Sequence, residues 1–188
     1  MVFVYSDYWG KCGENEPQRI INELVKQEGP RNVLFVATST IIDFKTIINK
    51  ISNLTNITFS EKNGFPQEVI DEFSNINVDF KTLNVLSTTK IIKKYSMIVA
   101  FGLFSKQVLW EKRELGMKNL IQLLKPNGIL VTSVKFEYMN EFKKTIKNLN
   151  LAITQWASEY EFIGIRNRFA LGIKSRGDIR VTYYLKTP

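Results

Sequence analysis

Two kinds of hydrophobic pattern alternate along the chain. Short continuous apolar runs, which are typical of strands buried on both faces of a sheet, occur at residues 32–37 (NVLFVA) and 96–101 (SMIVAF). Elsewhere apolar residues recur at the three- and four-residue spacing of one helix face, as in residues 41–54. Strands that alternate with helices predict an α/β fold, with a mostly parallel sheet that helices cover on both faces.

The full pattern predicts five strands that alternate with helices, followed by a segment of strands without helices. The strands are expected at residues 32–37, 57–61, 78–85, 96–101 and 129–134, and the helices at residues 17–28, 41–54, 67–73, 111–124 and 137–149. After residue 151 the strand-like stretches 152–160, 169–174 and 179–185 follow without helices, and residues 175–178 (SRGD) are typical of a hairpin turn. We therefore predict one domain, residues 1–188, with a doubly wound, seven-stranded sheet that ends in an antiparallel strand pair.

Composition supports a single folded domain and excludes several kinds of chemistry. The 188 residues are 44% hydrophobic and 23% charged, and no apolar run approaches the roughly 18 residues that span a bilayer. No secretory leader is visible, so we expect a cytoplasmic protein without a membrane partner. The chain has no histidine and one cysteine, which excludes Ser/His/Asp and Cys/His catalysis and histidine-ligated zinc. We predict no metal site.

Positive charge is concentrated near the carboxyl terminus. The chain has 26 basic and 18 acidic residues, a net charge of +8, and residues 162–188 hold six basic residues against Asp178 alone. Aromatic residues, among them Tyr183 and Tyr184, are interleaved with these cations, which suits phosphate contact and base stacking on RNA or another nucleic acid. The alternative is a strand pair whose aromatics face the core. The candidate nucleic-acid-binding residues are Arg166, Arg168, Lys174 and Arg176.

One segment carries a resemblance to a known family. Residues 120–131 (LIQLLKPNGILV) resemble the helix, Leu-Lys-Pro-Gly-Gly turn and fifth strand of class I S-adenosylmethionine-dependent methyltransferases, with Asn127 in place of the first glycine. Asparagine tolerates a positive φ, so we expect the turn to survive this exchange. Residues 95–101 are similar to the family's fourth strand. The resemblance implies S-adenosylmethionine as the cofactor.

The loop after the first strand departs from the family. Methyltransferases usually have Gly-x-Gly there, because glycines let the backbone approach the cofactor. This chain has Ala37, Thr38, Ser39 and Thr40. Free N–H groups and hydroxyls at the start of a helix can still hold a carboxylate, and ordinary N-capping is the alternative interpretation.

Three further residues match cofactor positions of the family. The resemblance places Glu61, at the end of the second strand, on the ribose hydroxyls, Asn84 near the adenine amine, and Phe101 beside the adenine ring. The alternatives are a solvated Glu61 and a Phe101 that belongs to the core. No Gly-x-Gly-x-x-Gly or phosphate-binding loop exists to favour another nucleotide.

The segment after the fifth strand is similar to the ribose 2′-O-methyltransferases of RNA. Lys135 falls where those enzymes place a lysine that takes the proton from the ribose hydroxyl, or it is a solvated lysine. The rest of their Lys-Asp-Lys-Glu tetrad does not carry over, because Gly102 follows the fourth strand and the last strands offer arginines. The main hypothesis is a methyltransferase that acts on RNA or another polyanion-associated substrate. The alternative is an inactive methyltransferase-like module that binds nucleic acid or protein.

Overall fold

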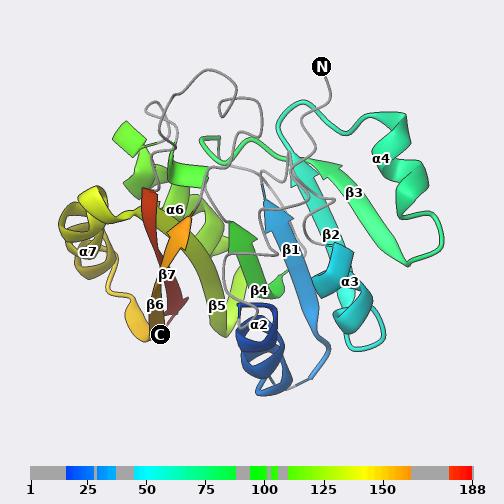
Figure 1. The fold of residues 1–188 in the computed structure, drawn as a ribbon, viewed down its shortest axis with the longest axis horizontal. Helices are drawn as coiled ribbons and strands as arrows, with labels where there is room; N and C mark the ends of the chain where they lie inside the picture. Colours follow the sequence, from blue (N-terminus) through cyan, green and yellow to red (C-terminus); the bar gives the residue numbers. More distant parts are fainter. Residues whose placement is uncertain are drawn as a thin grey trace, which may run out of the picture.

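The computed structural model describes residues 16–27, 29–36, 45–87, 94–100, 103–105, 110–161 and 178–187. Their centre is a seven-stranded sheet of order β3-β2-β1-β4-β5-β7-β6 (Figure 1). The strands are β1 (Asn32–Val36), β2 (Asn56–Glu61), β3 (Val78–Thr82), β4 (Tyr95–Ala100), β5 (Leu124–Lys135), β6 (Ala152–Glu161) and β7 (Asp178–Lys186). Strands β1 to β5 pair in parallel, and β7 is antiparallel to both β5 and β6. The predicted sheet and its antiparallel end are confirmed.

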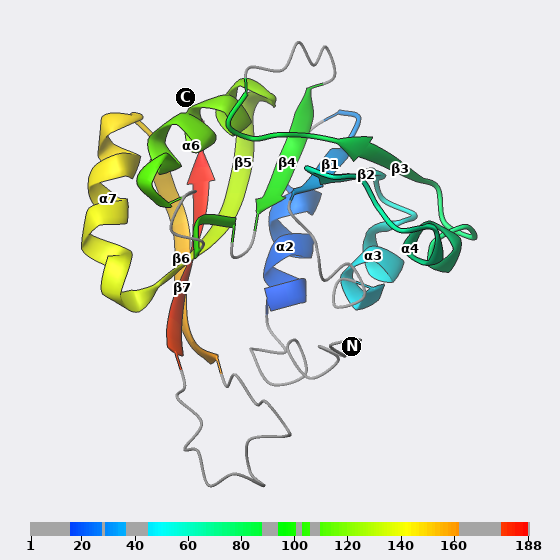
Figure 2. The same ribbon diagram turned by 90° about the horizontal axis from the view of Figure 1, so that it is seen from above.

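Helices cover both faces of this sheet (Figure 2). On one face lie α2 (Glu16–Val25), α3 (Lys45–Ile51) and α4 (Gln67–Glu72), and on the other lie α6 (Arg113–Gln122) and α7 (Met139–Asn148). The 3-10 turns η2 (Leu103–Ser105) and η3 (Phe136–Tyr138) follow β4 and β5. No helix in the described ranges has the length and apolar character to cross a membrane.

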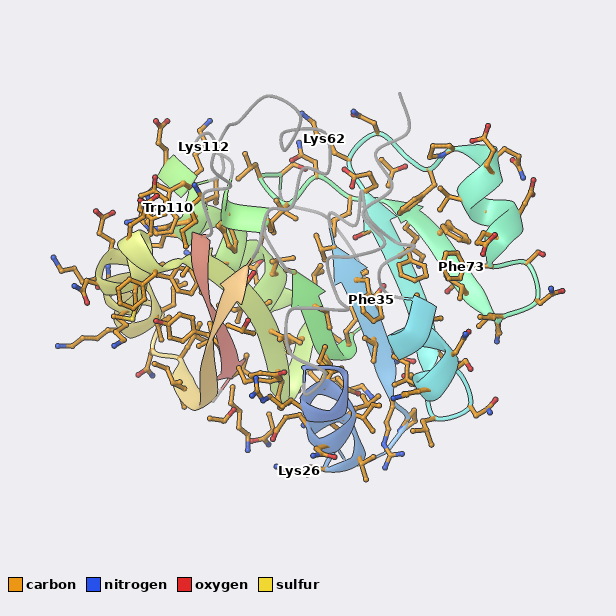
Figure 3. All side chains as sticks on the ribbon, in the orientation of Figure 1. Lys26, Phe35, Lys62, Phe73, Trp110 and Lys112 are labelled. Atoms are coloured by element: carbon orange, nitrogen blue, oxygen red, sulfur yellow. The ribbon has the colours of Figure 1, made fainter. Side chains whose placement is uncertain are left out.

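The strands are aligned so that apolar residues form continuous rows across the sheet. Phe80, Phe59 and Phe35 are register partners on β3, β2 and β1, and their ring centroids lie 5.7 Å and 5.3 Å apart. Phe73, just beyond α4, packs on Phe59 at 5.5 Å (Figure 3). The row continues through Val99 on β4, Val131 on β5 and Tyr184 on β7, all within the core beneath α2 and α3. This row fixes how the strand ends line up.

Several boundaries differ from the expected ones. The third strand ends at Thr82 because the chain turns at Asn84. The helix expected at 41–54 is described as α3, and Leu54 lies in the turn that follows, 41% exposed. The helix expected at 137–149 is divided into η3 and α7. Residues 169–174 and 175–177 lie outside the described ranges, so the strand and hairpin turn expected there stay predictions.

The turn that resembles the methyltransferase motif lies within β5 as an irregularity. Tyr95 pairs with Leu124 but Met97 pairs with Ile129, so the intervening β5 residues bulge out of the ladder. Asn127 has φ 61°, which confirms that asparagine accepts the left-handed conformation here. A Cβ on Gly128 would lie 2.8 Å from the Lys125 carbonyl oxygen, so this position requires glycine.

We expect Gly128→Ala to lower the free energy of unfolding by about 1 to 3 kcal/mol, because the added methyl group must displace a backbone carbonyl. Asn127→Gly is the matched control, because it leaves the packing unchanged, and we expect it to change stability by less than about 1 kcal/mol. Urea unfolding of both variants measures the difference. Equal stability of the two variants would contradict the close contact at Gly128.

The two tyrosines of β7 belong to the core. Tyr183 and Tyr184 are 1% and 0% exposed, and the Tyr183 ring packs on Phe142 of α7 at 5.4 Å. The core interpretation is therefore correct for these two residues, and their proposed part in base stacking is wrong. The Tyr183 hydroxyl has no hydrogen-bond partner among the described residues, and burial raises the pKa of Tyr183.

We expect Tyr183→Phe to stabilise the protein by about 1 kcal/mol at neutral pH, because it removes a buried hydroxyl that makes no hydrogen bond. The gain should grow above about pH 10, because the unfolded wild-type chain loses the phenolic proton first and this favours unfolding. Urea unfolding at pH 7 and pH 10.5 checks both statements. A destabilised variant would show that the hydroxyl has a partner in solution.

Candidate functional site

The carboxyl ends of the five parallel strands meet at one edge of the sheet, where the arrowheads point in Figure 1. Near this edge Val36 lies opposite Ser60, Glu61 opposite Thr82, and Ala100 opposite Thr132. Open α/β sheets bind their ligands in the crevice outside these strand ends. The candidate site is therefore the set of residues with which the strands end and the connections that follow them.

Two buried hydroxyls hold neighbouring strands together near this edge. The Ser60 hydroxyl donates to the Phe35 carbonyl oxygen at 3.2 Å, and the Thr132 hydroxyl donates to the Ala100 carbonyl oxygen at 3.0 Å. Each bond adds a side-chain link between two strands, β1 with β2 and β4 with β5. The sequence pattern does not single out these residues, because Thr58 and Ser133 are further hydroxyl residues on the same two strands.

Glu61 is the last residue of β2 and is half-buried. Its Oε1 atom accepts the backbone N–H of Lys62 at 3.0 Å, and its carbonyl oxygen accepts the N–H of Leu83 at 3.2 Å. The second contact ties the end of β2 to the segment after β3. The predicted cofactor residues Glu61 and Asn84 are thereby brought to the same part of the edge.

Asn84 builds the turn that follows β3. Its side-chain Oδ1 accepts the N–H of Leu86 at 3.1 Å, and its carbonyl oxygen accepts the N–H of Ser87 at 3.0 Å. Asn119, a buried residue of α6, donates from Nδ2 to the Val85 carbonyl oxygen at 2.8 Å and anchors the turn on the helix layer. An asparagine in mid-helix is the sequence signal for this anchor.

Lys135 ends β5, and its ammonium group lies 3.9 Å from a Glu137 carboxylate oxygen, with 33% of the lysine side chain exposed. The backbone register places Arg180 of β7 opposite Lys135, and Glu159 of β6 opposite Arg180. The sequence alone does not indicate which glutamate of the last strands would lie near the predicted lysine. Register brings Glu159 into the same row, which no local pattern could have indicated.

An arginine braces the connection that follows Lys135. Arg113 donates from Nε to the Thr145 hydroxyl at 3.1 Å and from Nη1 to the Trp110 carbonyl oxygen at 3.0 Å, and its Nη2 lies 3.6 Å from Glu141. Its guanidinium carbon is 4.1 Å from the centre of the Trp110 ring. That ring in turn packs on Tyr138 of η3 at 4.5 Å. These contacts join the start of α6 to η3 and α7.

The remaining predicted site residues lie outside the described ranges. They are Ala37, Thr38, Ser39, Thr40 and Phe101 for the cofactor and Arg166, Arg168, Lys174 and Arg176 for nucleic acid. Their roles stay predictions. Within the described residues, no group of three or more acidic or cysteine side chains could hold a metal ion.

No protein-family model matches the chain, and no curated protein matches it. Solved structures, in contrast, match this chain. A putative methyltransferase from Bacillus halodurans C-125 superimposes with a TM-score of 0.67 at 7% identity, over 93% of this chain and 99% of that one. The N-methyltransferase NodS from Bradyrhizobium japonicum WM9, in complex with S-adenosyl-L-homocysteine, gives a TM-score of 0.61 at 10% identity, over 93% and 86%.

A third structure, the precorrin 8W decarboxylase from Methanobacterium thermoautotrophicum, gives a TM-score of 0.59 at 10% identity, over 93% of this chain and 91% of that one. The strand order and these matches show that the chain has the class I S-adenosylmethionine-dependent methyltransferase fold. The resemblance carried by residues 95–101 and 120–131 is confirmed at the level of the fold. A fold hosts more than one reaction, so the activity must be argued from the site.

Proposed function

We propose that this protein is a methyltransferase that uses S-adenosylmethionine. The observation that carries the proposal is the position of Glu61, a half-buried carboxylate on the last residue of β2, tied through Leu83 to the turn of Asn84. In a sheet of this order, that part of the carboxyl edge is where a nucleoside binds. The solved structures with the same fold, one of them in complex with S-adenosyl-L-homocysteine, support the choice of cofactor.

The donor and acceptor groups that are present suit a ribose and an adenine. Only one Glu61 oxygen is engaged by the Lys62 N–H, and an ionised carboxylate offers about four lone-pair sites, so it can accept two ribose hydroxyls. Asn84 uses its Oδ1 in the turn, and its Nδ2 can donate to a ring nitrogen. The chemistry of these residues therefore fits the cofactor.

When bound, the cofactor would supply a methyl group on a sulfonium sulfur, with a thioether as the leaving group. The chain's part is then to position the acceptor and to remove its proton. We assign proton removal to Lys135, whose side chain is partly exposed at the end of β5. An unprotonated lysine amine can take the proton of an acceptor hydroxyl and so make its oxygen a better nucleophile.

We expect S-adenosylhomocysteine to raise the melting temperature of the protein. A ligand at about 100 times its Kd adds roughly 2.7 kcal/mol, which corresponds to roughly 5 to 10 °C for a domain of this size. Glu61→Ala should abolish the rise, whereas Glu68→Ala, which removes an exposed carboxylate on α4, should leave it intact. Differential scanning fluorimetry measures all three proteins. A flat response of the wild-type protein at millimolar ligand would sink the cofactor assignment.

We further propose that the acceptor is RNA. The support is the net charge of +8, the basic residues that precede β7 in the sequence, and Lys135 at the position that ribose methyltransferases use. One observation favours a second candidate function. The Oδ1 atom of Asn84, which was expected to contact adenine, already accepts a hydrogen bond within the turn. In that candidate the chain is an inactive module that binds nucleic acid without a cofactor.

We expect Lys135→Ala to abolish methyl transfer to single-stranded RNA without changing the thermal shift by S-adenosylhomocysteine. Lys143→Ala, an exposed lysine on α7, is the control with the same charge change and should keep full transfer. Unchanged methyl transfer by the Lys135→Ala variant would assign that lysine to the solvated surface. If the wild-type protein binds RNA but transfers no methyl group, the inactive module is favoured.

Replacing Arg166 and Arg168 with alanine should lower the salt-dependence slope of single-stranded RNA binding by about 1.4, because each arginine that neutralises a phosphate adds roughly 0.7 to the slope. Filter binding between about 50 and 200 mM salt measures the slope in the parent and the double variant. An unchanged slope would show that the two arginines do not meet the RNA backbone.

A further inference from the structure

Four neighbouring strands each carry one cation at the edge opposite the candidate site. Arg31 directly precedes β1, Lys94 directly precedes β4, and Lys125 is the second residue of β5. Lys186 is the last residue of β7, which runs antiparallel and so ends at this same edge. The order β1-β4-β5-β7 makes these strands neighbours. We call the four residues the amino-edge strip.

Hydrogen bonds between the connections hold the strip together. The Lys125 ammonium donates to the Pro30 carbonyl oxygen at 2.5 Å, next to Arg31, and Asn32 donates from Nδ2 to the Lys94 carbonyl oxygen at 3.3 Å. Lys94 donates from its ammonium to the Gln122 carbonyl oxygen, and the Thr187 N–H reaches the Gly128 carbonyl oxygen at 3.2 Å. The cations therefore occupy defined places on the fold.

The charges of the strip are not balanced by carboxylates. Among the described residues, no ion pair joins Arg31, Lys94, Lys125 or Lys186 to an acidic side chain, and the hydrogen bonds of the first three go to backbone carbonyls. Lys26 lies at the same edge, just after α2 (Figure 3). It differs from the strip residues because its ammonium group forms an ion pair with a Glu23 carboxylate oxygen at 2.6 Å. Lys94 is exposed and the other three strip residues are half-buried. The strip is a row of partly exposed positive charge across four neighbouring strands.

We propose that the amino-edge strip binds the phosphate backbone of a nucleic-acid duplex. Neighbouring strands are about 4.8 Å apart, so the four cations span about 14 Å, which is the axial rise over about four phosphate-to-phosphate steps of one strand of a duplex. Among the side chains that the structure describes, the exposed large aromatic one is Phe136, which follows β5 at the opposite edge, so they offer no stacking surface for unpaired bases at this edge. Contact through phosphates alone favours a duplex and carries no sequence preference.

This surface is separate from the methyl-transfer site and does not rest on that function. Its place on the amino edge leaves the carboxyl edge open, so a bound duplex would not cover Glu61 or Lys135.

The test compares two variants with equal net charge. The strip variant carries Lys94→Gln, Lys125→Gln and Lys186→Gln, and the control variant carries Lys118→Gln, Lys143→Gln and Lys144→Gln on exposed positions of α6 and α7. Glutamine can still donate to the backbone carbonyls that the lysines contact. Binding to a mixed-sequence DNA duplex of about two helical turns is measured between about 50 and 200 mM salt, with an RNA duplex of the same length as a second probe.

We expect the salt-dependence slope to fall by about 2.7 in the strip variant, at roughly 0.9 for each phosphate that is no longer neutralised, and by less than about 1 in the control variant. Equal changes in the two variants, or no duplex binding by the parent protein at about 50 mM salt, would overturn the proposal. Displacement of the duplex by polyglutamate at equal charge concentration would also overturn it, in favour of an acidic protein partner.

If the triple variant does not fold, each of the three single variants is expected to lower the slope by about 0.9, and three unchanged slopes would overturn the proposal. The thermal shift by S-adenosylhomocysteine should be the same in the parent protein and the strip variant. That second measurement keeps the test of the strip independent of the cofactor assignment.

Discussion

The register of the parallel strands is the constraint on which the other features depend. Phe59, Phe35, Val99 and Val131 form one buried row, with the partly buried Phe80 at its end, only when each strand is aligned as observed. A slip of one residue would turn a strand's buried side chains to the opposite face, where other apolar residues already pack. The same alignment sets Glu61 beside the end of β3 and Lys135 beside β7. The packing of the core therefore decides the geometry of the candidate site.

The sheet could be predicted because its central strands are apolar without interruption. β1 and β4 are buried along nearly their whole length, and such runs have few alternatives to a buried strand. β3 ends before the expected residue 85 because the Asn84 side chain accepts a hydrogen bond from the Leu86 N–H and forms a turn, which hydropathy does not reveal. Tyr183 and Tyr184 lie in a basic segment after polar residues, a pattern that is typical of a strand with one exposed face. Both faces of β7 are nevertheless covered, and both rings are buried.

Within the candidate site, the sequence could predict only those residues that stand at the end of a single predicted strand. Glu61 and Lys135 fall at strand ends that the pattern located within one residue. The groups that surround them come from distant segments. Asn119 reaches Val85 from α6, Glu159 enters the row of Lys135 through β7, and Arg113 links two helices. Each of these contacts depends on register or helix docking, so no spacing along the chain encodes it.

The Arg113 brace has a consequence for how the edge beside β5 can respond to a ligand. Since the guanidinium group is shared among Thr145, Glu141 and Trp110, and the Trp110 ring packs on Tyr138, the first turn of α6, η3 and the start of α7 are linked before any ligand arrives. Little conformational entropy is then left to lose on this side when a ligand docks. Discrimination between ligands would come from the shape that this side already has, rather than from closure around them.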